Sequence, residues 1–202
     1  MGAIIHNVSM VAQQSSPLCW VACCMMAIQY RRGQSIEANA LGEQLELRMA
    51  TRPGAPSNQV VYNNMRSIGF RLNRLSEIWV PGRHMPSMRR NLPGDVGFAA
   101  KIEHLLRTHG PIVFNHLVGS ISYGPGVPIG NYGSHAVLIT GIDTGSGSVY
   151  MHNPWGTIGV RDPQGEASGK LRLEHIANPI TLVESAVQFW EGRGEIPFAY
   201  LP

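Results

Sequence analysis

The cysteine at position 19 has the surroundings of a nucleophile. It follows Ser16, which can cap a helix, and Pro17, which suits the first helical position. Cys19 is then expected as the third helical residue, beside unpaired backbone amides and the positive end of the helix dipole. Both favour the thiolate over the thiol. A buried structural cysteine is the alternative, because free cysteine is among the most buried residue types.

Four short motifs follow one another in a fixed order along the chain. They are Gln13, Cys19-Trp20, the stretch 133–139 that contains His135, and the stretch 152–156 that contains Asn153 and Trp155. In this combination the sequence resembles the papain-like cysteine proteases. In that family a glutamine lies six residues before the nucleophile, the cysteine opens a central helix and precedes a tryptophan, a histidine opens a later strand, and an Asn or Asp beside a tryptophan follows. Gln13 lies six positions before Cys19, and Asn153 lies 18 positions after His135.

The resemblance implies a role for each residue type. Cys19 is the nucleophile, and the imidazole of His135 takes the thiol proton and later gives it to the leaving amine, because its pKa lies near neutrality. Gln13 and the backbone amide of Cys19 stabilise the developing oxyanion, a contribution of ~2.7–4 kcal/mol per donor in analogous sites. Gln14 could do the same if the loop before the helix is shifted by one residue.

Asn153 is expected to orient His135 by accepting a hydrogen bond from the ring nitrogen that faces away from sulfur. It follows directly on the second strand of a predicted hairpin, so the antiparallel return can bring it level with His135. Asp143 is the rival orienting group, but eight extended residues span roughly 26 Å. His152 is the rival base. Trp155 is expected to shield the His–Asn bond from water, and Trp20 is expected to pack in the core beneath the cleft.

The departures from papain itself are also informative. Its Cys-Gly-Ser-Cys-Trp signature, disulfides, propeptide and leader are absent, and residues 16–22 resemble instead compact bacterial members, which include proteases delivered into other cells as effectors and toxins. The resemblance covers the N-terminal segment, the central helix and residues 98–156. Residues 35–95 and 160–202 carry none of it.

These features lead to three functional hypotheses. The first is a cysteine peptidase that cleaves protein substrates through a Cys-His-Asn triad and a thioester. The second is a deamidase or acyltransferase using the same site. The third is a protein-binding module on a protease fold. An immunity or inhibitor protein is the partner expected for a delivered toxin.

The predicted elements support an α+β, two-lobed papain-like fold in a single domain over residues 1–202. A central helix from Cys19 is apolar on all sides and ends at Arg31-Arg32-Gly33. Further predictions are helices over 35–49, 58–68 and 98–109, a strand over 111–118, and a hairpin of 135–142 with 148–152. A boundary near 78–95 divides a mainly helical lobe, 1–95, from a β-rich lobe, 96–202.

Composition excludes several classes of protein. With 44% hydrophobic and 14% charged residues, the chain is neither disordered nor a coiled coil. The basic residues, of which only Lys101 and Lys170 are lysines, are scattered, so we expect no nucleic-acid partner. No stretch is long and apolar enough for a membrane span, and no leader is recognised.

The cysteines and histidines do not suggest a metal site. Cys19, Cys23 and Cys24 lie within six residues without a second cluster, which indicates a reducing compartment, either the cytoplasm or that of a target cell. We expect Cys23 and Cys24 to pack in the core, and we expect neither metal nor cofactor. Structural roles are expected for five other histidines, namely His84, His104, His109, His116 and His175.

Overall fold

The structure is a computed structural model that describes residues 2–11, 18–33, 57–81, 97–122, 133–154 and 175–202. Its elements in chain order are β1 (Ile4–Ile5), α1 (Cys19–Arg32), α3 (Asn58–Ser67), β2 (Arg71–Asn73), the 3-10 turn η1 (Leu75–Glu77), α4 (Phe98–His109), β3 (Ile112–Leu117), β4 (Ser134–Asp143), β5 (Ser148–His152), β6 (Ile176–Pro179), α5 (Ile180–Gly192) and β7 (Phe198–Tyr200).

A seven-stranded sheet organises these elements. Its strand order is β2-β7-β3-β4-β5-β6, with β1 paired to β4, and the neighbouring strands are antiparallel. The ten-residue strand β4 lies at the centre and pairs with β3, β5 and β1. Strands from both halves of the chain therefore belong to one sheet.

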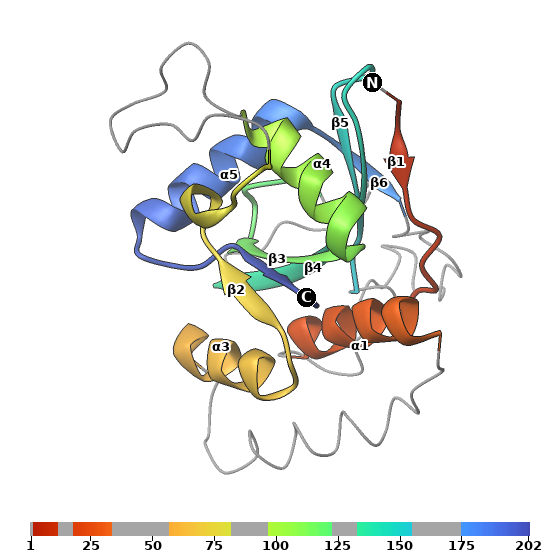
Figure 1. Cartoon of the computed structure of the whole chain (residues 1–202). Coiled ribbons are helices and arrows are strands. Elements are labelled where there is room, and N and C mark those ends of the chain that lie inside the picture. The colour runs from red at the N-terminus through yellow and green to blue at the C-terminus, as the bar shows by residue number, and fades with distance from the viewer. Residues whose placement is uncertain (1, 12–17, 34–56, 82–96, 123–132, 155–174) are drawn as a thin grey trace, which may run out of the picture.

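Helices cover both faces of the sheet (Figure 1). Helices α1 and α3 lie against one face, where the core includes Ala136 and Leu138 of β4. Helices α4 and α5 lie against the other, where the core includes Val137 and Ile139 of the same strand. Successive residues of β4 thus point to opposite faces, and both faces are buried. This arrangement confirms the expected α+β fold, with a helix packed on an antiparallel sheet.

Helix α1 is buried over most of its length, from Trp20 to Ile28. At its C-terminus Gly33 adopts the left-handed region with φ 61°, and its amide donates to the carbonyl of Gln29 at 3.0 Å. The helix begins later than the sequence predicts. Leu18 is the N-cap, and its carbonyl accepts the first helical hydrogen bond, from Ala22 at 3.1 Å.

That bond makes Cys19 the first helical residue and not the third. The expected capping residues Ser16 and Pro17 lie outside the described residues. The other predicted boundaries agree closely with the structure for the helices at 58 and 98, the strand at 112 and the hairpin. The predicted helix over 35–49 and most of the proposed lobe boundary also lie outside the described residues.

The N-terminal segment, residues 2–11, runs along β4 towards its His135 end. Ile4 and Ile5 pair with Ile142 and Gly141, and the amide of His6 then donates to the carbonyl of Thr140 at 2.8 Å. A glycine is needed at 141, because a Cβ there would lie 2.4 Å from the Ile4 carbonyl oxygen. The close approach of the two backbones fixes where this segment lies.

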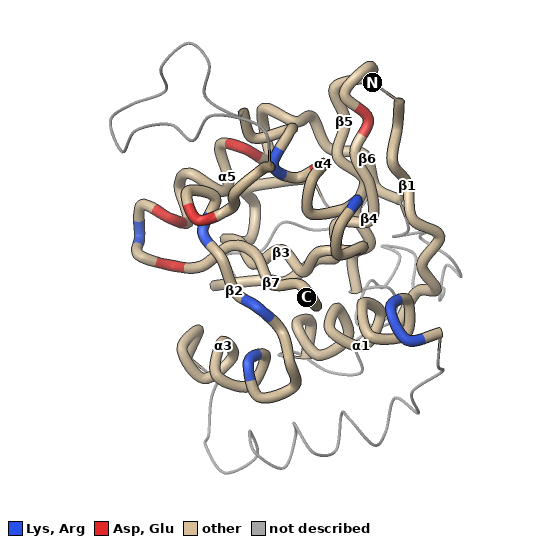
Figure 2. Tube along the Cα trace, in the orientation of Figure 1, with Lys and Arg blue, Asp and Glu red and all other residues tan. Residues whose placement is uncertain are grey.

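The charged residues in the described part of the chain form no basic stripe. Lys and Arg are spread over several elements with Asp and Glu among them (Figure 2). Within the described part of the chain, no helix is both long enough and apolar enough to cross a membrane.

Candidate active site

The thiol of Cys19 lies where the start of α1 meets the start of β4. It is close enough to the backbone amide of Ala136 for hydrogen bonding, and also to the amides of Trp20 and of Cys19 itself. Ala136 directly follows His135. Packing of α1 on β4 therefore brings the predicted nucleophile next to the predicted base, although 116 residues separate them in the chain.

Burial raises the pKa of the Cys19 thiol, and the three amides act in the opposite direction without cancelling that effect. The sequence predicted the reverse, because the helix start alone favours a thiolate. The effect of desolvation on the pKa of Cys19 is larger than the effect of the helix amides. Cys19 is still partly exposed, whereas Cys23 and Cys24 are buried. Burial raises the pKa of both buried thiols.

His135 and Asn153 are joined by a direct hydrogen bond. Nε2 of His135 lies 2.9 Å from Oδ1 of Asn153, and both side chains are buried. Asn153 follows β5 immediately, and the pairing of Leu138 with His152 places it across β4 from the residues next to His135. With Nε2 donating to the amide oxygen, Nδ1 of the neutral ring is the nitrogen that can accept a proton.

Burial lowers the pKa of His135 to about 4, with the Asn153 hydrogen bond acting in the opposite direction. Desolvation of Cys19 and desolvation of His135 have the same consequence for the protonation state of the pair. They favour an uncharged pair, a Cys19 thiol and a neutral His135 imidazole, over an ion pair at rest. Such a ring is available as a general base over a wide pH range.

No local sequence pattern places His116 beside the site, but the structure does. In β3 it lies directly opposite His135, with the ring centroids 5.9 Å apart in an edge-on arrangement. Its other face stacks on Phe114 at 4.9 Å, and Nδ1 donates to the carbonyl of Leu117 at 2.8 Å. Burial lowers the pKa of His116 to about 3. A long connection separates the two strands, so local sequence patterns do not predict the pairing register that creates this contact.

The two rival residues have other partners. His152 donates from Nε2 to the carbonyl of Val8 at 2.9 Å and accepts at Nδ1 from the amide of His175 at 3.0 Å. Both ring nitrogens are engaged with backbone, which leaves no site for a substrate proton. Asp143 accepts from the amide of Gly145 at 2.8 Å and closes the hairpin turn, at the opposite end of β4 from His135.

The remaining predicted site residues are only partly described. Trp20 is buried in the core between α1 and the sheet, as expected for core packing. Gln13 and Trp155 lie outside the described residues. Among the residues that are described, no three His, Cys, Asp or Glu side chains gather as they would around a metal ion.

A comparison with protein families matches most of the chain. Residues 5–168 match the Peptidase_C39 like family. The chain belongs to this family. It is thereby a cysteine peptidase, a hydrolase of the papain-like superfamily, and peptides or proteins are its substrates. The match begins at residue 5, within the N-terminal segment, includes α1, β3, β4 and β5, and ends before β6, α5 and β7. None of the curated proteins matches the sequence.

Proposed function

We propose that this C39-like peptidase cleaves protein substrates with Cys19 as nucleophile, His135 as general base and acid, and Asn153 as the residue that orients His135. The 2.9 Å hydrogen bond between His135 and Asn153 carries the proposal, together with the Cys19 thiol at the amide of Ala136. The bond selects the tautomer in which Nδ1 accepts a proton.

The chemistry then proceeds in two halves. Sγ of Cys19 attacks the peptide carbonyl carbon while its proton passes to His135. The tetrahedral intermediate collapses, the C–N bond breaks, and His135 gives the proton to the leaving amine. A thioester remains on Cys19. Water then attacks the thioester with His135 again as base, the carboxylic acid product leaves, and the thiol recovers its proton.

The oxyanion of each intermediate needs hydrogen-bond donors. We assign this role to the backbone amide of Cys19 and to the side chain of Gln13, six residues upstream. The amide of Cys19 is unpaired within α1, because the first residues of a helix have no intrahelical acceptor. Donors of this kind act on charge that exists only in the transition state, so their loss lowers kcat more than it changes KM.

Three substitutions test the assignment of the orienting residue. Asn153→Ala should lower kcat severely but leave more activity than His135→Ala, since the ring is then present but misoriented. Asp143→Ala should have little effect, because its carboxylate serves the hairpin turn. An inactive Asp143→Ala enzyme together with a nearly normal Asn153→Ala enzyme would contradict the triad. Circular dichroism of each variant shows that it is folded.

The substrate can be found by mass spectrometry of new N-termini in a lysate treated with the enzyme or with Cys19→Ala. New N-termini that require Cys19 support proteolysis. Conversion of glutamine to glutamate without new N-termini would identify a deamidase using the same thiol. Binding of a protein by both forms, with no covalent change in it, would identify a binding module.

We also infer that the peptidase acts as an effector or toxin inside a target cell, countered by an immunity or inhibitor protein. The support is the similarity of residues 16–22 to delivered bacterial proteases. The free cysteines, which suit a reducing cytoplasm, agree with this role. Expression in a bacterial host should slow growth for the wild type and not for Cys19→Ala. Equal growth of the two strains would contradict this role.

A further inference from the structure

Four aromatic rings form a buried column across the sheet that ends at His135. Phe198 of β7 stacks on Phe114 of β3 with the ring centroids 5.7 Å apart, and Phe114 stacks on His116 at 4.9 Å. The ring of His116 then stands edge-on to that of His135, with the centroids 5.9 Å apart and the planes at 78°. Such a separation and angle are typical of edge-to-face ring pairs. Strand register produces the column, because the first two rings and the last two rings each belong to directly paired residues.

The ring of His116 is itself held in place. Its Nδ1 donates to the carbonyl of Leu117 at 2.8 Å and lies 3.1 Å from Oγ of Ser120, in the turn that follows β3. Phe114 stacks on one face of the ring. Burial lowers the pKa of His116 to about 3, so the ring is neutral and adds no positive charge beside His135 when that residue takes up the thiol proton. His116 therefore presents a fixed and uncharged ring to His135.

The hydrogen bond to Asn153 fixes only part of the orientation of His135. Nε2 lies near the axis of the Cβ–Cγ bond, so rotation of the ring about that bond moves Nε2 little and moves Nδ1 more. This torsion has broad minima in histidine, and its value decides where Nδ1 points. A second contact, away from that axis, is needed to hold the plane of the ring and with it the nitrogen that takes the thiol proton.

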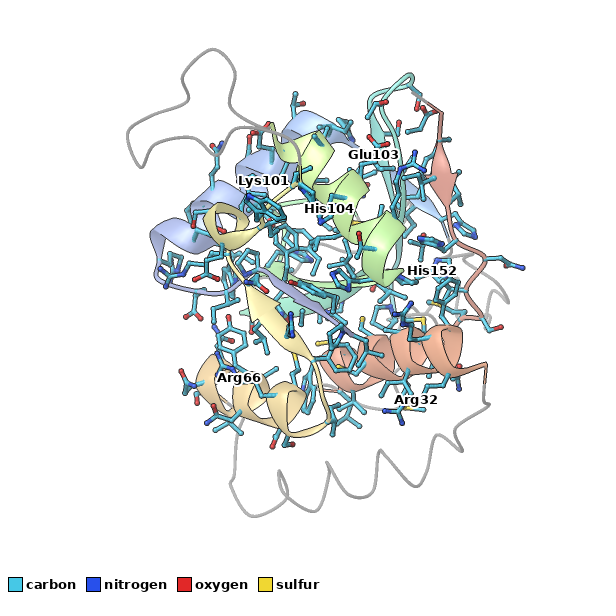
Figure 3. The ribbon with its side chains drawn as sticks, in the orientation of Figure 1. Arg32, Arg66, Lys101, Glu103, His104 and His152 are labelled. Atoms are coloured by element: carbon cyan, nitrogen blue, oxygen red, sulfur yellow. The ribbon has the colours of Figure 1, made fainter. Side chains whose placement is uncertain are left out.

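The two neighbours of β4 supply these two contacts. Strand β4 lies between β3 and β5 in the sheet. Asn153, directly after β5, bonds to Nε2 of His135 at 2.9 Å, and His116, in β3, stands against the ring. In the view of Figure 3, His152 at the end of β5 lies above α1, the helix that begins with Cys19. The ring of His135 is thus held from both sides at the end of the sheet where the nucleophile lies.

We propose that His116 is a positioning residue for the peptidase reaction. Its ring holds the plane of the His135 imidazole and keeps Nδ1 in the direction that the proposed function requires, towards the Cys19 thiol. His116 exchanges no proton with the substrate and acts only through His135. This inference therefore rests on the proposed function.

Two substitutions separate the ring of His116 from its hydrogen bond. His116→Asn removes the ring but keeps a donor near the position of Nδ1. His116→Phe keeps a ring and removes the donor, and the Leu117 carbonyl still accepts from the hydroxyl and the amide of Ser120 at 2.7 and 3.1 Å. With a fluorogenic peptide that the wild type hydrolyses, we expect His116→Asn to lower kcat by ~10-fold or more with KM little changed. His116→Phe should retain most of the wild-type kcat.

Alkylation by iodoacetamide separates misorientation of His135 from loosened packing. The proposed function makes the reaction of Cys19 depend on His135, so His116→Asn should slow alkylation of Cys19 together with kcat. Loosening of the sheet would instead expose Cys23 and Cys24, which are buried against it. Both of these cysteines should stay unlabelled in His116→Asn.

A His135→Ala background tests whether His116 acts through His135. There, His116→Asn should cause no further loss in the rate of Cys19 alkylation, because the ring that His116 holds is already absent. This comparison does not need His116→Phe to fold. His116→Gln, which also lacks a ring, takes the place of His116→Asn if that variant is unfolded.

Each contrary result has a distinct meaning. The inference is wrong, and the proposed function stands, if the variants without a ring keep normal kcat and alkylation, if they lose as much in the His135→Ala background, if Cys23 and Cys24 become labelled, or if neither variant folds. A folded His116→Phe enzyme as impaired as His116→Asn also overturns the inference. If His135→Ala itself changes neither kcat nor alkylation, the proposed function fails and this inference fails with it.

Discussion

At the scale of single residues, desolvation sets the protonation of the site. Burial raises the pKa of the Cys19 thiol and lowers the pKa of the His135 imidazole to about 4. The peptidase therefore holds its nucleophile as a thiol and its base as a neutral ring. Attack on substrate and transfer of the proton to His135 must occur together, because a separated thiolate is disfavoured in this environment.

This protonation state predicts the acid side of the pH profile. An ordinary histidine loses its base form below its pKa of ~6.5, but His135 stays neutral well below that value. We therefore expect kcat/KM to remain flat from about pH 7.5 down to about pH 5.5. The profile is measured with a fluorogenic peptide that the wild type hydrolyses, under conditions where circular dichroism shows a folded enzyme. An acid limb centred near pH 6.5 would mean that an ion pair or a more exposed histidine controls the rate.

The order of the site residues was predictable from the sequence, and their ionisation was not. The spacing of Gln13, Cys19, His135 and Asn153 marks the family, and the predicted His135–Asn153 contact is present in the structure. The direction in which the pKa of the Cys19 thiol shifts depends on what covers the start of α1. That covering comes from the packed sheet and not from the local sequence. The contact of His116 with His135 depends on strand register for the same reason.

At the scale of elements, β4 positions most of the site. Its first residues carry His135 and the amide of Ala136, and β5 returns Asn153 to the same end. Its last residues hold β1 at Gly141. The hairpin and α4 were predictable because their signals are local, namely alternating apolar residues, helical spacing and terminal glycines. Strands β1 and β7 have two and three residues and depend on distant partners, so local patterns do not reveal them.

Gly141 provides a test of how β1 is held. Gly141→Ala places a Cβ 2.4 Å from the carbonyl oxygen of Ile4, a backbone atom that cannot move aside alone. We expect the free energy of unfolding to fall by ~1–3 kcal/mol, as for other overpacked sites, and the N-terminal segment to become sensitive to limited proteolysis. Gly192→Ala is the matched control, because no atom lies within 4 Å of its added Cβ. A Gly141→Ala protein as stable and as resistant to proteolysis as this control would contradict the contact.

At the scale of the whole molecule, the sheet buries two neutral histidines side by side. Burial lowers the pKa of His116 to about 3 and that of His135 to about 4. In the unfolded chain both take up protons near pH ~6.5. Between that pH and about 4 the unfolded state binds more protons than the folded state, so stability is lost as the pH falls.

The expected loss is up to about 1.4 kcal/mol per pH unit for each histidine. Urea denaturation at about pH 7 and about pH 5 measures it, since the first value lies above this window and the second lies within it. His116→Gln removes one of the groups that contribute and should reduce the pH dependence. Equal unfolding free energies at the two pH values, or the same slope with and without His116, would show that the histidines are not held neutral by folding.

The central claim is that His135 activates Cys19, and the rate of alkylation of Cys19 by iodoacetamide measures this directly. Mass spectrometry assigns the modified residue, and loss of peptidase activity is followed in the same samples. Because Cys19 is also the more exposed cysteine, faster labelling than at Cys23 or Cys24 is not sufficient, and the decisive comparison is with folded His135→Ala. We expect Cys19 to react first in the wild type, in step with loss of activity, and to react ~10-fold or more slowly in His135→Ala. Equal rates in the two proteins, or equal slow labelling of all three cysteines, would contradict the account.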